Sequence, residues 1–91
     1  MIITRIQYSD LNELKCLYDE LTQCTTDYDK MRVNYKLMQK NTHYYLLGAR
    51  TDKKLVGSLM GILCLDLVGE CKPFMLIENV IVSAPYRSKN C

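Results

Sequence analysis

The positions of the apolar residues predict a strand followed by two helices. Residues 2–7 are rich in β-branched side chains, which favours a first strand. Apolar residues then recur at spacings of three and four, which is the spacing of one buried stripe on a helix. The first stripe consists of Leu11, Leu14, Leu17, Tyr18 and Leu21. The second stripe consists of Tyr28, Met31, Tyr35 and Met38. We therefore expect two amphipathic helices.

Polar residues ahead of each stripe are candidates for helix caps. Ser9 and Asp10 precede the first stripe, and Asp10 with Glu13 fits a capping box, in which each side chain bonds a free backbone N–H of the other. Thr25 and Thr26 interrupt the helical pattern and can cap the second helix. The first helix is therefore expected to begin close to Asp10, and the second close to Thr26.

From residue 43 onward the helical spacing disappears, and a hairpin is expected. The ranges 44–50 and 55–68 have the composition of strands, and the polar segment 51–54 lies between them. Such a short connection is typical of two antiparallel neighbours.

A last strand is expected at 74–83, after a loop at 68–73. It is apolar on both faces except for Glu78 and Asn79. Because strands that are buried on both faces usually lie inside a sheet, we expect this one to be central.

The order of strand, two helices and three strands predicts an α+β fold of the α/β-sandwich type. The sheet is expected to be mainly antiparallel, with the helices packed on it. A chain of 91 residues forms at most one small domain, and no repeat or linker divides it. Residues 1–91 are therefore expected to belong to a single domain.

Charge and hydropathy argue against nucleic-acid and membrane partners. The formal net charge is only +2, which is too little for a basic binding surface. The longest apolar run, 59–65, contains Gly61 and is far too short to span a bilayer. We expect neither kind of partner.

The cysteines indicate a reducing compartment. Their number, five, is odd, no two have C-x-x-C spacing, and the chain has one histidine, His43. This pattern does not favour a zinc site, and no metal is expected. The interpretation is that the cysteines are reduced, mostly as small packing residues, and that the protein is cytosolic.

The stretch 76–90 carries the most specific pattern, and it resembles part of a known family. It reads LIENVIVSAPYRSKN, with an acidic residue in an apolar strand and then a turn that contains proline, an aromatic residue and arginine. This resembles the fourth strand and acetyl-CoA loop of the GNAT superfamily of N-acetyltransferases. The range 55–57 with Gly61 resembles that family's third strand. The order of elements is similar to the first half of the GNAT fold.

The resemblance weakens at the family's R-x-x-G-x-G/A motif. Arg87 matches the first position, Asn90 stands where the first glycine belongs, and Cys91 follows directly. Glycines in this motif let backbone N–H groups turn towards a pyrophosphate at a helix N-terminus. We therefore expect a chain that lacks the C-terminal half of the domain and is inactive alone.

The resemblance implies acetyl-CoA as co-substrate and a primary amine as acceptor. The backbone of Val80, Ile81 and Val82 would pair with the pantetheine arm, and the N–H of Ile81 would polarise the thioester carbonyl. The residues that the resemblance places near the pyrophosphate are Arg87, Ser88, Lys89 and Asn90.

Glu78 is the residue that the resemblance favours for proton removal from the amine. Alternation along the strand places it on the same face as Leu76 and Val80, where burial would raise its pKa towards neutrality. The alternative is that Glu78 is half-exposed or paired with a lysine.

For other candidate residues, a functional role and a purely structural role are both open. Tyr28, Met31 and Tyr35 could line an acceptor pocket or simply pack in the core. Arg87 could contact pyrophosphate or be a solvated charge. No tyrosine is assigned as general acid by motif.

Three functions remain open at this stage. The first is acetyl transfer to an amine, whose identity the sequence does not specify. The second is a non-catalytic remnant that forms a homodimer or binds a partner through the exposed last strand. The third is a small α/β interaction domain unrelated to acetyl transfer.

Overall fold

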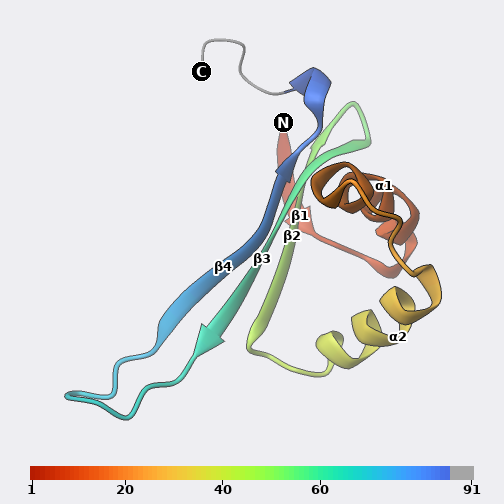
Figure 1. The fold of residues 1–91 in the computed structure, drawn as a ribbon. Helices are drawn as coiled ribbons and strands as arrows, with labels where there is room; N and C mark the ends of the chain where they lie inside the picture. The colour runs from red at the N-terminus through yellow and green to blue at the C-terminus, as the bar shows by residue number, and fades with distance from the viewer. Residues whose placement is uncertain (87–91) are drawn as a thin grey trace.

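Four strands and two helices follow one another in the computed structural model, which describes residues 1–86 (Figure 1). The elements are β1 (Ile2–Arg5), α1 (Leu11–Thr22), α2 (Tyr28–Gln39), β2 (Tyr44–Thr51), β3 (Lys54–Cys64) and β4 (Phe74–Val82). Short 3₁₀ turns precede α1 and follow β4. The predicted α+β class and the predicted order of elements are confirmed. The expected strand at 55–68 is shorter, because β3 ends at Cys64 and a loop follows.

The sheet is antiparallel throughout, with the strands in the order β1-β2-β3-β4. β4 is therefore an edge strand of the described chain, and the expectation of a central strand is wrong. All of its side chains except that of Ile81 are exposed. Apolar side chains on both faces of a strand favour its burial, but they do not determine the position of the strand in the sheet.

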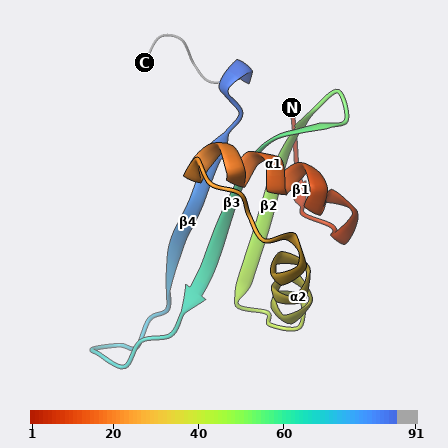
Figure 2. The ribbon, with the colours of Figure 1, turned by 45° about the vertical axis from the view of Figure 1, so that its right-hand side comes forward.

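Both helices cover the same face of the sheet (Figures 1 and 2). The core lies between that face and α1, with Tyr35 as the buried residue of α2. Its buried residues are Ile6, Leu11, Leu14, Leu17, Tyr35, Leu55 and Ile81. The two apolar stripes thus face the sheet, as their spacing predicted, except at Leu21, which is exposed.

The expected capping box at the start of α1 is wrong. The Asp10 carboxylate accepts the Gln7 N–H at 2.7 Å and pairs with the Arg50 guanidinium at 2.5 Å. The Glu13 carboxylate instead accepts the Leu55 N–H of β3 at 2.9 Å. Both acidic groups therefore tie α1 to the sheet, and these partners could not be read from local spacing.

The cap of α2 is Asp27, not Thr25 or Thr26. Its carboxylate accepts the Lys30 N–H at 3.1 Å. The Thr26 N–H is bonded to Asp19 of α1 instead. The start of α2 is thus set one residue later than expected, because Thr26 is held by the other helix.

Tyr35 links α2 to the end of β1. Its hydroxyl donates to the Ile6 carbonyl at 2.7 Å, and the side chain is buried. Burial raises the pKa of Tyr35, so its hydroxyl keeps the proton that this bond requires.

Residues 1–86 form short helices and carry no group of potential metal ligands. No helix there is long and apolar enough to cross a membrane. No three His, Cys, Asp or Glu side chains of this part of the chain could hold a metal ion together. The cysteines described there, Cys16, Cys24, Cys64 and Cys71, have free thiols.

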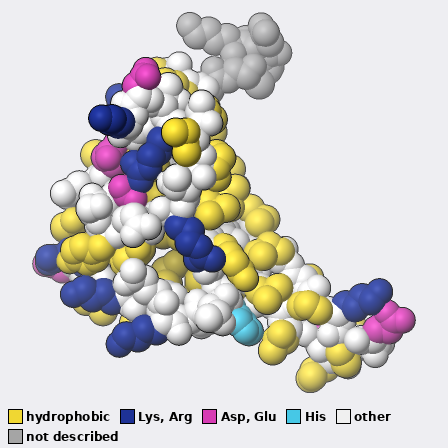
Figure 3. All heavy atoms as spheres, turned by 180° about the vertical axis from the view of Figure 1, so that it is seen from behind, with side chains coloured by type: hydrophobic (Ala, Val, Ile, Leu, Met, Phe, Trp, Pro, Cys, Tyr) yellow, Lys and Arg dark blue, Asp and Glu magenta, His cyan; other side chains and the backbone are white. Residues whose placement is uncertain are grey.

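The face of the sheet away from the helices is apolar and exposed along β4. A Cβ added to Gly61 would lie 2.9 Å from the Met75 sulfur and 3.6 Å from Ile77, so these side chains share that face. Met75 and Ile77 are 45% and 49% exposed. Figure 3, seen from behind, shows hydrophobic side chains gathered along the strands towards the β3–β4 loop.

Candidate functional site

The pairing of β4 with β3 is interrupted by a β-bulge at Asn79 and Val80. These two residues together lie opposite the single residue Leu59. Asn79 has a φ of 54°, which is the left-handed region that side chains other than glycine rarely adopt. Asparagine tolerates this region better than most residues, which fits its position in an otherwise β-favouring run.

The bulge interrupts the backbone pairing between β4 and β3. The Leu63 N–H donates to the His43 carbonyl before β2 at 2.8 Å. Backbone groups of every second strand residue point the same way, so those of Leu59 also face β2. Within residues 1–86, β3 therefore offers no backbone partner to Asn79 and Val80.

Of the three residues predicted to pair with pantetheine, Ile81 differs from the other two. The Ser83 N–H donates to the Val56 carbonyl at 2.7 Å, and alternation turns the backbone of Ile81 towards β3 as well. The Ile81 side chain is 4% exposed, in the core. Val80 and Val82 have exposed side chains. The Ile81 N–H therefore faces β3, and the predicted contact of this group with a thioester stays a prediction.

Glu78 lies directly before the bulge and is exposed. It pairs with Met60, and alternation places it on the same face as Leu76, as predicted. The extra residue of the bulge puts Val80 on the opposite face, so that part of the prediction is wrong. The expected burial is also wrong, because β4 is an edge strand that the described chain does not cover. The assignment of Glu78 as base stays a prediction.

An apolar pocket of about 330 Å³ lies between the two helices and the sheet, beside the bulge. We call it the α1–α2 pocket. Its walls include Leu14, Met31, Met38, Leu46 and Met60, and Asn79 also lines it. Met31 packs against the core and also lines this pocket. Its predicted contact with an acceptor stays a prediction.

Tyr18 also lines the α1–α2 pocket and is tied to the sheet. Burial raises its pKa, and its hydrogen bond with Ser58 opposes that shift. The Ser58 hydroxyl in turn donates to the Leu47 carbonyl at 2.8 Å. Tyr18 is therefore a neutral, fixed wall of the pocket at physiological pH.

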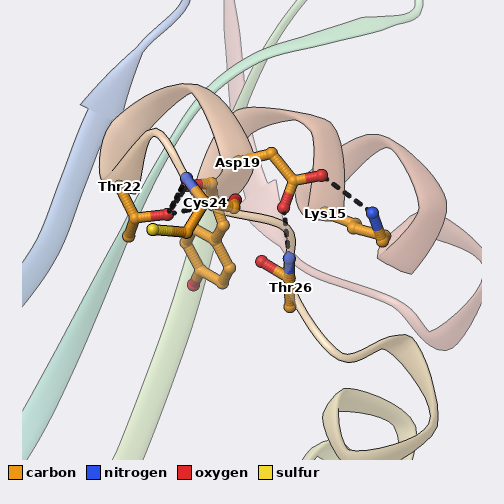
Figure 4. Close-up of polar contacts among 6 residues, drawn as sticks. Lys15, Asp19, Thr22, Cys24 and Thr26 are labelled. Atoms are coloured by element: carbon orange, nitrogen blue, oxygen red, sulfur yellow. Dashed lines mark hydrogen bonds and ion pairs between the residues drawn. The ribbon is translucent and has the colours of Figure 1, made fainter.

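The carboxylate of Asp19 holds the connection between the helices, which forms one rim of the pocket (Figure 4). It accepts the Thr26 N–H at 2.6 Å and pairs with the Lys15 ammonium at 2.8 Å. The neighbouring Thr22 hydroxyl oxygen accepts the Cys24 N–H at 3.2 Å. These bonds replace helical ones at the end of α1 and position the start of α2.

Asp19 should make the stability of the fold depend on acid. The hydrogen bonds from Lys15 and Thr26 lower the pKa of Asp19 to about 2. Because this folded-state pKa lies below the unfolded one, the stabilisation is complete above about pH 4 and is lost as the pH falls to about 2. Urea unfolding over this range should therefore show a smaller loss of stability for Asp19→Asn than for the wild type. Glu70→Gln, in the exposed β3–β4 loop, should keep the wild-type pH dependence. Equal curves for Asp19→Asn and wild type would contradict the assignment.

Four residues, 87–90, are predicted to contact a pyrophosphate. Arg87, Ser88, Lys89 and Asn90 lie outside the described residues. The turn that leads to them is tied to α1, because the Ala84 N–H donates to the Glu20 carboxylate at 3.2 Å.

Comparison with solved structures identifies the fold. A protein of Agrobacterium tumefaciens that has been named as a candidate acetyltransferase has a TM-score of 0.87 and 18% identity, over 99% of this chain and 64% of its own. A GNAT family acetyltransferase of Staphylococcus aureus has a TM-score of 0.81 and 22% identity, over 98% of this chain and 67% of its own. Glucosamine-6-phosphate N-acetyltransferase of Arabidopsis thaliana has a TM-score of 0.77 and 16% identity, over 98% of this chain and 64% of its own.

These likenesses show that the chain has a GNAT-like fold and spans about two thirds of the length of such structures. No protein-family model matches the sequence, and no curated protein matches it either. At these identities the resemblance establishes the fold, and the activity has to be argued from the site.

The bulge is the feature of the candidate site that was not predicted from the sequence. Its signal was present, because Asn79 is a poor strand former inside the run from Leu76 to Val82. A residue that tolerates a left-handed backbone in such a run marks a candidate bulge. The contribution of Tyr18 to the pocket had no comparable local signal.

Proposed function

We propose that the chain carries the acetyl-CoA-binding strand of an N-acetyltransferase that transfers acetyl to a primary amine. The observation that carries the proposal is the bulge at Asn79 and Val80, where the regular pairing of β4 with β3 is interrupted and backbone donors become available to a ligand. The GNAT-like fold supports the same activity.

The reaction requires fixed hydrogen-bond donors at the thioester. The amine nitrogen attacks the carbonyl carbon, a C–N bond forms, the C–S bond breaks, and coenzyme A leaves as its thiol. Negative charge gathers on the carbonyl oxygen during the attack, and preorganised N–H groups stabilise it. The proposal assigns this role to the N–H groups of Asn79 and Val80.

The outer edge of β4 is suited to the pantetheine arm. This arm contains two amide groups, and an extended amide chain can add to a sheet edge as an extra strand does. No strand of residues 1–86 lies on the outer side of β4, and Val80 is part of the bulge on this edge. By resemblance, Arg87, Ser88, Lys89 and Asn90 would meet the pyrophosphate.

Glu78 is assigned as the acceptor of the amine proton. Most primary amines are protonated near neutral pH and must lose a proton before they attack. The carboxylate of Glu78 is exposed, and its residue directly precedes the proposed donors. It can therefore take the proton from the amine directly or through water.

The proposal is tested by calorimetric titration of acetyl-CoA into the purified chain. We expect saturable binding with one site per chain. Adenosine 3′,5′-bisphosphate, which lacks the pantetheine arm, should bind more weakly because it cannot pair with β4. Absence of acetyl-CoA binding, or equal binding of the two ligands, would contradict the proposed role of β4.

The exposed edge of β4 favours a homodimer as the second candidate. Side chains on both sides of this strand are apolar and exposed, and an edge of this kind can pair with a second copy. Sedimentation velocity should then show a concentration-dependent dimer that Ile77→Lys dissociates. A monomer at every concentration would exclude this candidate. Because acetyl-CoA would use the same edge, it should also compete with the dimer.

A cytosolic location is part of the proposal. Cys16, Cys24 and Cys71 are exposed free thiols, and such thiols persist in a reducing compartment. Labelling of these cysteines in intact cells with a thiol reagent should succeed without prior reduction.

A further inference from the structure

We propose that the amine acceptor is a small monoamine with an apolar body, which binds in the α1–α2 pocket. This inference rests on the proposed function and names the class of its acceptor.

The pocket adjoins the place where the acetyl group is proposed to lie. Asn79, the left-handed residue of the bulge, lines it directly. Met60 lines it as well, and Met60 is the β3 residue paired with Glu78. A ligand that fills the pocket therefore has one end beside the thioester donors and the proposed base.

The walls of the pocket suit an apolar body of modest size. Leu14, Met31, Met38 and Leu46 are among the apolar residues of the wall. The volume of about 330 Å³ is at the small end of ligand pockets, where a single ring with a short chain fits. Methionine side chains are flexible and adapt to such groups.

The charges around the pocket favour a single positive charge on the ligand. Its charged residues are Asp27 and Lys30, of opposite sign. The Asp27 carboxylate already accepts the Lys30 N–H as the cap of α2. Because these two charges are of opposite sign, the pocket offers no excess of carboxylate to a second cation, and burying one there is costly. The single ammonium group of a monoamine can instead face Glu78, which lies outside the lining of the pocket.

The class of acceptor is tested by saturation-transfer NMR on the purified chain. The probes are 2-phenylethylamine, a monoamine with an aromatic body, and spermidine, a polycation. We expect saturable binding of 2-phenylethylamine and none of spermidine. Met31→Trp fills the pocket and should weaken 2-phenylethylamine binding about tenfold or more, as expected when an apolar pocket loses its space. Leu37→Trp, on the exposed side of α2, should bind as the wild type does.

A second variant keeps the test decisive if Met31→Trp fails to fold. Asn34 is exposed and lines the same pocket. Asn34→Trp should therefore fill the pocket without changing the packing of the core. Circular dichroism reports which variants fold. Binding of spermidine as tight as that of 2-phenylethylamine, or unchanged amine binding in a folded pocket variant, would overturn the inference.

Coenzyme A titration on the same samples separates this inference from the proposed function. Coenzyme A binding without 2-phenylethylamine binding would overturn the acceptor class and leave the proposed function standing. Amine binding without coenzyme A binding would overturn the proposed function, and the acceptor role with it.

Discussion

Replacing Leu14 by alanine should cost about 2–5 kcal/mol of folding free energy. The Leu14 side chain is 1% exposed and lies in the core between α1 and the sheet. Its truncation removes apolar contact and leaves a cavity that the surrounding residues fill only in part. Since small domains have only about 5–15 kcal/mol in total, a large share of the stability should be lost.

A matched control for this prediction lies on the same helix. Leu21 is 38% exposed, so Leu21→Ala should cost well under half as much, on the order of 1 kcal/mol or less. Urea unfolding followed by circular dichroism measures both variants. Equal losses would show that the packing of α1 on the sheet is not centred on Leu14. Leu14 also lines the α1–α2 pocket, so Leu14→Ala should enlarge the amine site if it still folds.

Replacing Asn79 by valine should disrupt the bulge and with it acetyl-CoA binding. The φ of 54° at Asn79 costs a side chain with a Cβ about 1–2 kcal/mol, and β-branching adds to the conflict. Valine instead favours regular strand geometry, which would turn the donors of the bulge away from the thioester. We expect acetyl-CoA affinity to fall about tenfold or more, which corresponds to about 1.4 kcal/mol.

Asn79→Gly is the matched control for the valine variant. Glycine also loses the asparagine amide, but it adopts a left-handed backbone without strain. It should therefore keep the bulge and most of the affinity. Calorimetry with acetyl-CoA and urea unfolding on both variants distinguish the backbone from the side chain. A glycine variant that binds as weakly as the valine variant would assign the effect to the Asn79 amide. Unchanged binding in the valine variant would remove the bulge from the site.

Local interactions explain why the succession of elements was predictable. The stripes from Leu11 and from Tyr28 each place apolar groups on one face of a helix, and burial of those faces makes both segments helical. The hairpin of β2 and β3 follows from two β-favouring runs with a short polar turn between them. Helix caps were predicted less well. Asp10 and Glu13 have the right spacing for a box, but their partners, Arg50 and Leu55, come from strands far along the chain.

The candidate site was predicted in part. The stretch around Glu78 was located by its resemblance to an acetyl-CoA-binding strand, and the structure places Glu78 beside the bulge. Val80 was assigned to the wrong face of the strand because the single extra residue of the bulge reverses the alternation of side chains beyond it. The pocket had no local signal at all, because α1, α2, β2, β3 and β4 each contribute to its wall.

The sequence by itself determined the kind and order of the elements, since periodicity and turn chemistry act over a few residues. It also determined which side chains need burial. Only the tertiary structure decided which strand lies at the edge of the sheet in residues 1–86, where the pairing of β4 with β3 is interrupted, and which residues line the pocket. These features depend on strand register and on packing between distant segments, and neither is encoded at short range.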